Sequence, residues 1–67
     1  MHEPLYWDDA YPIALRIRRF FPQIELTSAS TYELRTLVLQ LEGFADDPTM
    51  GHPERLEDIQ REWLDLT

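Results

Sequence analysis

The chain has 67 residues and no cysteine, so one small apolar core has to hold it together. At this size, folding buries only about 60 % of the surface of the unfolded chain, and no disulfide can supplement the core. Hydrophobic residues make up 43 % of the sequence, which is enough for a core and too much for a disordered chain. We therefore expect a single folded domain over residues 1–67, with residues 1–4 frayed.

Acidic residues outnumber basic ones by thirteen to six, which gives a net charge of −7. The excess is concentrated in residues 42–67, which carry eight acids and two Arg, whereas residues 1–41 carry five acids and four Arg. This charge opposes binding to nucleic acid and favours a basic or cationic partner. The apolar runs are all shorter than about six residues and the start is unlike a secretory signal. We expect a cytoplasmic chain that does not span a membrane.

Apolar residues recur at helical spacing in three segments, which Pro and Gly separate. The first segment covers residues 9–20, where Asp8 or Asp9 can cap the first turn and Pro22 ends the pattern. Its apolar face consists of Ile13, Ile17, Phe20 and Phe21. The following residues, 23–29, alternate apolar and polar side chains, as in a short extended segment or an irregular turn.

The second helix opens with a capping box, in which Ser30 and Glu33 bond to each other's backbone N–H groups. Its apolar face consists of Leu34, Leu37, Val38 and Leu41. Gly43 suits a left-handed residue that closes this helix, so that Phe44 returns to the core. A loop over residues 45–52 follows.

Pro53 opens the third helix, whose apolar residues are Leu56, Ile59, Trp63 and Leu66. Four acids fall on the opposite side within an arc of about 80°, at Glu54, Asp58, Glu62 and Asp65. The sequence thus predicts a mainly α, compact three-helix domain. We expect Trp7 and Trp63 to pack in its core.

The carboxylates are the strongest chemical feature, since Glu57 lies beside the four acids of the third helix and Glu42, Asp46 and Asp47 precede it. Oxygen donors of this kind suit weak binding of Fe(II), Mg, Ca or Mn, or an Arg-rich surface of another protein. The alternative is a solvated face, partly neutralised by Arg55 and an i,i+4 pair between Glu57 and Arg61.

No catalytic constellation is visible, so we expect no enzymatic activity. His2 and His52 lack a metal-ligand spacing, and the Ser and Thr residues suit capping better than nucleophilic catalysis. We expect the Arg side chains at positions 16, 18 and 19 to be solvated, or to form a second charged surface.

Three motifs resemble those of the IscX family, small acidic proteins of iron–sulfur cluster assembly. They are Leu5-x-Trp7-x-Asp9, the run Leu41-Glu42-Gly43-Phe44-Ala45-Asp46-Asp47-Pro48, and Trp63-Leu64-Asp65. The resemblance implies a winged-helix-like fold with at most short extended segments. It also implies an accessory protein that binds cysteine desulfurase through an acidic surface and modulates it, interacts with ferredoxin, and binds Fe(II) weakly.

With this resemblance, the carboxylates acquire predicted roles. The predicted metal ligands are Glu42, Asp46, Asp47, Glu57, Asp58 and Asp65. The predicted partner-binding residues are Asp9, Glu42, Asp46, Asp47, Glu54, Asp58, Glu62 and Asp65. We expect a monomer that binds no nucleic acid. The alternatives are a dedicated ferrous-iron carrier and, ranked lower, an acidic mimic of DNA.

Overall fold

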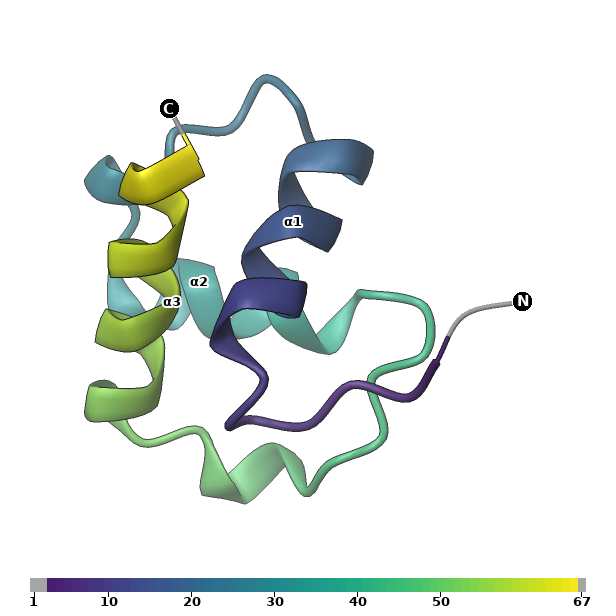
Figure 1. Cartoon of the computed structure of the whole chain (residues 1–67). Coiled ribbons are helices and arrows are strands. Elements are labelled where there is room, and N and C mark those ends of the chain that lie inside the picture. The colour runs from purple at the N-terminus through teal and green to yellow at the C-terminus, as the bar shows by residue number, and fades with distance from the viewer. Residues whose placement is uncertain (1–2, 67) are drawn as a thin grey trace.

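Three helices form in the segments that the sequence predicts. In the computed structural model, which describes residues 3–66, α1 covers Ala10–Phe20, α2 covers Thr31–Leu39 and α3 covers Pro53–Leu66. Two short 3-10 turns, η1 at Leu26–Ser28 and η2 at Pro48–Met50, lie in the connections. Figure 1 shows α1 and α3 side by side, with α2 crossing behind them. The described residues form a compact, mainly helical domain without a strand. The first two residues of the end predicted to fray lie outside this range.

Helix α1 keeps its predicted ends but not all of its predicted buried face. Pro12 lies in the first turn, where its missing N–H removes no helical hydrogen bond, and the helix ends before Pro22. The buried residues of α1 are Ile13, Ala14 and Ile17. The prediction that Phe20 is buried is wrong, because its side chain is 46 % exposed and its ring lies 5.8 Å from the Arg19 guanidinium.

The connection from α1 to α2 is a turn, the second of the two predicted possibilities. Its central residue, Leu26, is fully buried. The side-chain amide of Gln60 on α3 donates hydrogen bonds to the carbonyls of Leu26 and Ala29, at 2.9 and 3.2 Å. The Leu26 carbonyl also accepts from the Ala29 N–H at 3.1 Å, and the two bonds from Gln60 tie the turn to α3.

Helix α2 begins with the predicted capping box. The Glu33 N–H donates to Ser30 Oγ at 3.1 Å, and the Ser30 N–H donates to Glu33 Oε1 at 3.2 Å. The helix ends at Leu39, so Gly43 is not its immediate closing residue. Gly43 does adopt the left-handed conformation, with φ of 90°, in the turn that brings Phe44 back to the core.

The core lies between the three helices. The contact between α1 and α3 is the most extensive in the fold. From α3 come the buried residues Leu56, Ile59 and Trp63, and from α2 come Leu34 and Val38. Leu66 is half-buried and packs against this core. No helix in the described part of the chain has the length and apolar character to span a membrane.

The segment before α1 joins the loop before α3, and we call this contact the Trp7 junction (residues 5–7 against residues 43–51). Leu5 and Phe44 form an isolated parallel bridge, in which the Leu5 N–H donates to the Gly43 carbonyl and the Ala45 N–H donates to the Leu5 carbonyl, both at 2.9 Å. Figure 1 shows the two segments side by side. The family resemblance implies at most short extended segments, and this isolated bridge is consistent with that expectation.

Trp7 is the centre of the junction, with only 2 % of its surface exposed. Its ring meets the Phe44 ring edge-on at a centroid distance of 4.8 Å, and its indole N–H donates to the Asp47 carbonyl at 2.6 Å. The indole also lies so close to Gly51 that a Cβ there would be 2.6 Å from Cζ2. The junction therefore requires both a large ring at position 7 and no side chain at position 51.

We predict that Gly51→Ala destabilises the fold by about 1–3 kcal/mol, because the methyl group overlaps the indole. The backbone at Gly51 has φ of −81°, which alanine adopts readily, so the effect is steric. Phenylalanine at position 7 lacks Cζ2 and Cη2, the two indole atoms that the methyl group overlaps. Gly51→Ala should therefore lower the free energy of unfolding clearly less in a Trp7→Phe background. Urea unfolding of the four proteins in this double-mutant cycle provides the test. Equal costs in both backgrounds would contradict the steric explanation.

Candidate functional site

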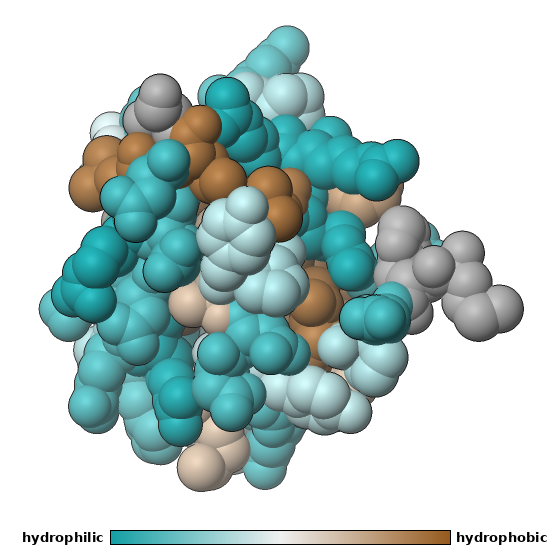
Figure 2. All heavy atoms as spheres, in the orientation of Figure 1, coloured by the Kyte–Doolittle hydropathy of each residue, from teal (hydrophilic) through white to brown (hydrophobic). Residues whose placement is uncertain are grey.

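Helix α3 presents an acidic face, which we define as Glu54, Asp58, Glu62 and Asp65. Three of these side chains are exposed and Glu62 is half-buried. The observed helix covers all four positions, so the predicted arc of about 80° holds. In Figure 2 the side of the molecule formed by α3 is largely hydrophilic, with apolar side chains gathered near its C-terminal end.

One ion pair touches the acidic face in the described residues. Arg61 Nη1 lies 3.1 Å from Asp58 Oδ1, and both side chains are well exposed. The prediction that Arg61 pairs with Glu57 is therefore wrong, because its guanidinium binds Asp58, three positions earlier, instead of Glu57, four positions earlier. An exposed pair of this kind contributes at most about 1 kcal/mol.

Three Arg residues donate to backbone carbonyls rather than to carboxylates. Arg16 reaches the Glu42 carbonyl at 2.9 Å, and Arg35 reaches the Gly51 carbonyl at 2.9 Å. Arg18, in the last turn of α1, donates to the Leu66 carbonyl at the end of α3. These guanidinium groups tie helices to loops and to a helix end, so Arg16 and Arg18 are not simply solvated.

The two loop acids accept hydrogen bonds from the loop and from the segment before α1. Asp46 Oδ2 accepts from the Trp7 N–H at 2.9 Å, and Asp46 Oδ1 accepts from the Asp47 N–H at 2.7 Å. Asp47 Oδ1 accepts from the Thr49 N–H at 2.9 Å and from the Thr49 hydroxyl at 2.8 Å, which caps η2. The Asp46 carboxylate therefore holds the Trp7 junction, and the Asp47 carboxylate holds the η2 turn beside it.

Asp9 also has a structural bond, although not the predicted one. It precedes the first residue of α1, but its side chain makes no cap to that helix. Its Oδ2 accepts instead from the Tyr6 N–H at 3.0 Å, which closes a tight turn before the helix. The expected capping by Asp9 is thus wrong, because the carboxylate faces back along the chain.

The predicted metal ligands do not come together. No group of three or more His, Asp or Glu side chains in residues 3–66 is arranged to hold a metal ion. Asp58 and Asp65 lie seven positions apart, which is about 10.5 Å along a helix, too far to share one ion. Asp46 and Asp47 accept backbone hydrogen bonds, as described above. In the described residues the predicted ligands therefore form no cluster of three or more that could hold Fe(II).

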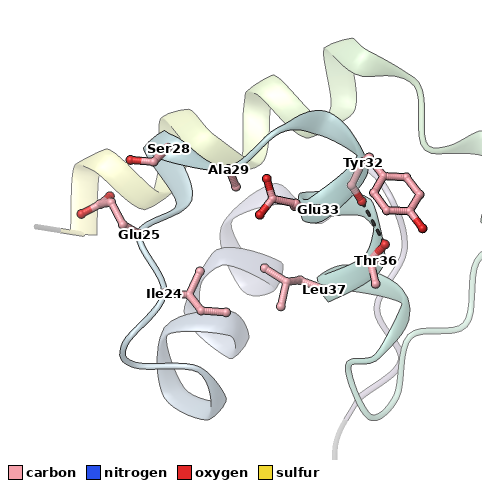
Figure 3. A pocket seen from close by; sticks show the side chains of 8 residues that line it. All are labelled: Ile24, Glu25, Ser28, Ala29, Tyr32, Glu33, Thr36 and Leu37. Atoms are coloured by element: carbon pink, nitrogen blue, oxygen red, sulfur yellow. Dashed lines mark hydrogen bonds between the residues drawn. The ribbon is translucent and has the colours of Figure 1, made fainter.

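Sequence reasoning missed a cavity of about 500 Å³ between η1 and α2 (Figure 3). Glu25 and Glu33 line it together with apolar residues. The pKa of Glu25 is below its ordinary value, first because the Thr27 hydroxyl and N–H donate to its carboxylate, and further because the Trp63 indole N–H donates to it. The one sequence signal at this place is the capping box at Glu33, which by itself indicates a structural role for that carboxylate.

The chain belongs to a known family. Its fold and site define a small, acidic, three-helix protein whose motif residues hold a buried junction. Residues 5–67 match the model of the iron–sulphur cluster assembly family, the IscX family that the motifs resemble, and the chain is a member of it. Over 61 residues it is 31 % identical to an uncharacterized protein of Pseudomonas aeruginosa, across 91 % of this chain and 92 % of that protein.

The bonds to Asp47 predict a pH dependence. The Thr49 N–H, and then its hydroxyl, lower the pKa of Asp47 from its ordinary value of 3.8. A carboxyl whose pKa is lower in the folded state stabilises the fold above its unfolded pKa, and this contribution is lost as the pH falls through the folded pKa. The free energy of unfolding should therefore decrease below about pH 4.

Thr49→Val removes the hydroxyl donor, so the pKa of Asp47 should rise toward 3.8 while that of Glu25 stays unchanged. Thr27→Val is the matched control and should raise the pKa of Glu25 alone. Carboxyl carbon NMR titrations of both variants measure these values. An unmoved Asp47 in the Thr49 variant would show that the hydroxyl bond is absent in solution.

Proposed function

We propose that the chain is a non-enzymatic accessory protein of iron–sulfur cluster assembly that binds a cysteine desulfurase through the acidic face of α3. Family membership supports the pathway. The choice of this surface is supported by one observation: among the described residues, no ion pair neutralises Glu54, Glu62 or Asp65. Sulfur chemistry then belongs to the partner, and this chain contributes recognition.

The electrostatics favour a basic partner. Like charges at helical spacing repel each other by a few tenths of a kcal/mol per pair, and a cationic surface brought against them relieves that repulsion. Of the six Arg side chains, Arg61 alone forms an ion pair with the acidic face among the described residues, at Asp58, and three others donate to carbonyls. A charged surface of this kind also accelerates encounter with a basic partner.

Asp46 and Asp47 have a different part in this proposal from the one predicted. Their carboxylates accept hydrogen bonds from the Trp7 junction and its loop, so they stabilise the loop next to α3 in addition to carrying negative charge. Charge reversal at Asp46 would test the fold and the interface together. The interface is better tested at α3.

Fe(II) binding stays a prediction from the family resemblance and is no step of the proposal, because the candidate ligands do not converge. Binding to ferredoxin stays a prediction as well. A dedicated iron carrier would need a donor set that the described residues do not form. A DNA mimic would leave the family motifs unexplained.

We predict that Asp65→Lys weakens binding to the desulfurase by about tenfold or more at low salt. Asp65 is exposed and lies in the last turn of α3, where a cation suits the helix dipole, so the variant should keep its stability. Glu3→Lys, which changes the charge equally at an exposed position outside α3, is the matched control and should bind like the wild type.

Calorimetric titration of wild type and both variants, at two salt concentrations, measures this effect. Wild-type affinity should fall as salt rises, and the difference between the variants should shrink with it. Salt-independent affinity, or equal weakening by both substitutions, would exclude docking through the acidic face.

A further inference from the structure

The cavity between η1 and α2 has a built apolar floor. Ile24 and Leu37 are half-buried and pack against the core, and in Figure 3 their side chains point toward a common opening. The volume of about 500 Å³ lies within the range usual for ligand-binding clefts. An occupant of this floor needs an apolar stem or side chain.

Two carboxylates border this floor in fixed positions. Glu25 Oε1 accepts from the Thr27 hydroxyl at 2.8 Å and from the Trp63 indole N–H at 3.3 Å. Glu33 Oε1 accepts from the Ser30 N–H at 3.2 Å. The second oxygen of each carboxylate has no hydrogen-bond donor among the described residues. No Arg or His is among the eight residues that line the cavity.

An unused aromatic ring completes the rim. Tyr32 is 73 % exposed and stands at the edge of the cavity beside Thr36 (Figure 3). It contributes little to the core, so its ring is available to an occupant. The face of an aromatic ring attracts a guanidinium group, and Arg is the cation found there most often.

These features together select a long cationic side chain. A purely apolar occupant would take water from the two carboxylates without replacing its hydrogen bonds, which is costly. An anionic occupant would be repelled by them. Arg combines an aliphatic stem with a planar fork that bonds carboxylates in a bidentate way, whereas Lys offers only a point charge.

We propose that this cavity binds an arginine side chain presented by a short apolar-flanked segment of a partner protein. The stem lies on Ile24 and Leu37, and the guanidinium meets Glu33 next to Tyr32, while Glu25 adds negative charge at the η1 end of the cavity. This surface contains none of the four residues of the acidic face of α3, so the inference does not rest on docking to the desulfurase. The chain then has two separate anionic surfaces for protein partners.

The test uses the full chain, labelled with ¹⁵N, and a blocked peptide of sequence Ser-Leu-Arg-Leu-Ser. Three further probes are the same peptide with Lys, the same peptide with citrulline, which is the neutral isostere of Arg, and free arginine. The Arg peptide should shift the amide signals of residues 24–37 and saturate. The Lys peptide should bind more weakly than the Arg peptide. The affinities of the citrulline peptide and of free arginine should be lower than that of the Arg peptide by about tenfold or more.

Variants locate the site. Glu33→Gln keeps the capping box, since Gln also accepts from the Ser30 N–H, and should lower affinity for the Arg peptide by about fivefold or more. Tyr32→Ala, at an exposed helical position, should weaken binding without loss of stability. Asp65→Asn removes one charge from α3 and should bind the peptide within about twofold of wild type.

The proposal is overturned by any of four results. They are equal binding of the citrulline peptide, equal binding of free arginine, amide shifts confined to α3, and wild-type affinity in Glu33→Gln. None of these results bears on the salt-dependent binding of the desulfurase, so the two proposals fail separately.

Discussion

The buried indole of Trp7 is the constraint on which the rest of this small structure depends. A chain of 67 residues without cysteine has few large side chains to bury, and this one places Trp7 beneath a loop some forty positions later. The indole N–H donates to the loop backbone, and the Trp7 N–H donates to the Asp46 carboxylate. Arg16 on α1 and Arg35 on α2 hold the two ends of the connection between α2 and α3, at the Glu42 and Gly51 carbonyls. The junction fixes the residues between these two points.

This arrangement separates two kinds of carboxylate that look alike in the sequence. Asp46 and Asp47 belong to the family motif, and their oxygens accept hydrogen bonds from the loop itself. The acids on α3 other than Asp58 have no ion pair among the described residues. The loop acids keep their negative charge but would lose bonds within the loop on turning to a partner, whereas the α3 acids other than Asp58 have no such bonds among the described residues.

The helices and most of the core could be predicted from the sequence, because Pro53, the capping box at Ser30 and the helical spacing of apolar residues are local signals. The roles of the acids could not, since they depend on contacts across the chain: the bond from Trp7 to Asp46 spans 39 positions. The pairing of Arg61 with Asp58 rather than Glu57 turned on a choice of rotamer that spacing does not decide. The cavity between η1 and α2 could not be predicted either, because it depends on how Ile24 and α2 lie relative to each other in the fold.

The most direct test of this division of roles compares two substitutions that each remove one negative charge, Asp46→Asn and Asp65→Asn. For each variant, the thermal unfolding midpoint and the affinity for the desulfurase at low salt are measured on the same preparation. The account predicts that Asp46→Asn lowers the midpoint, because an amide can accept only one of the two backbone bonds, and leaves the affinity of the folded protein nearly unchanged. Asp65→Asn should leave the midpoint unchanged and weaken binding. The reverse pattern, with Asp46 controlling affinity and Asp65 stability, would contradict it.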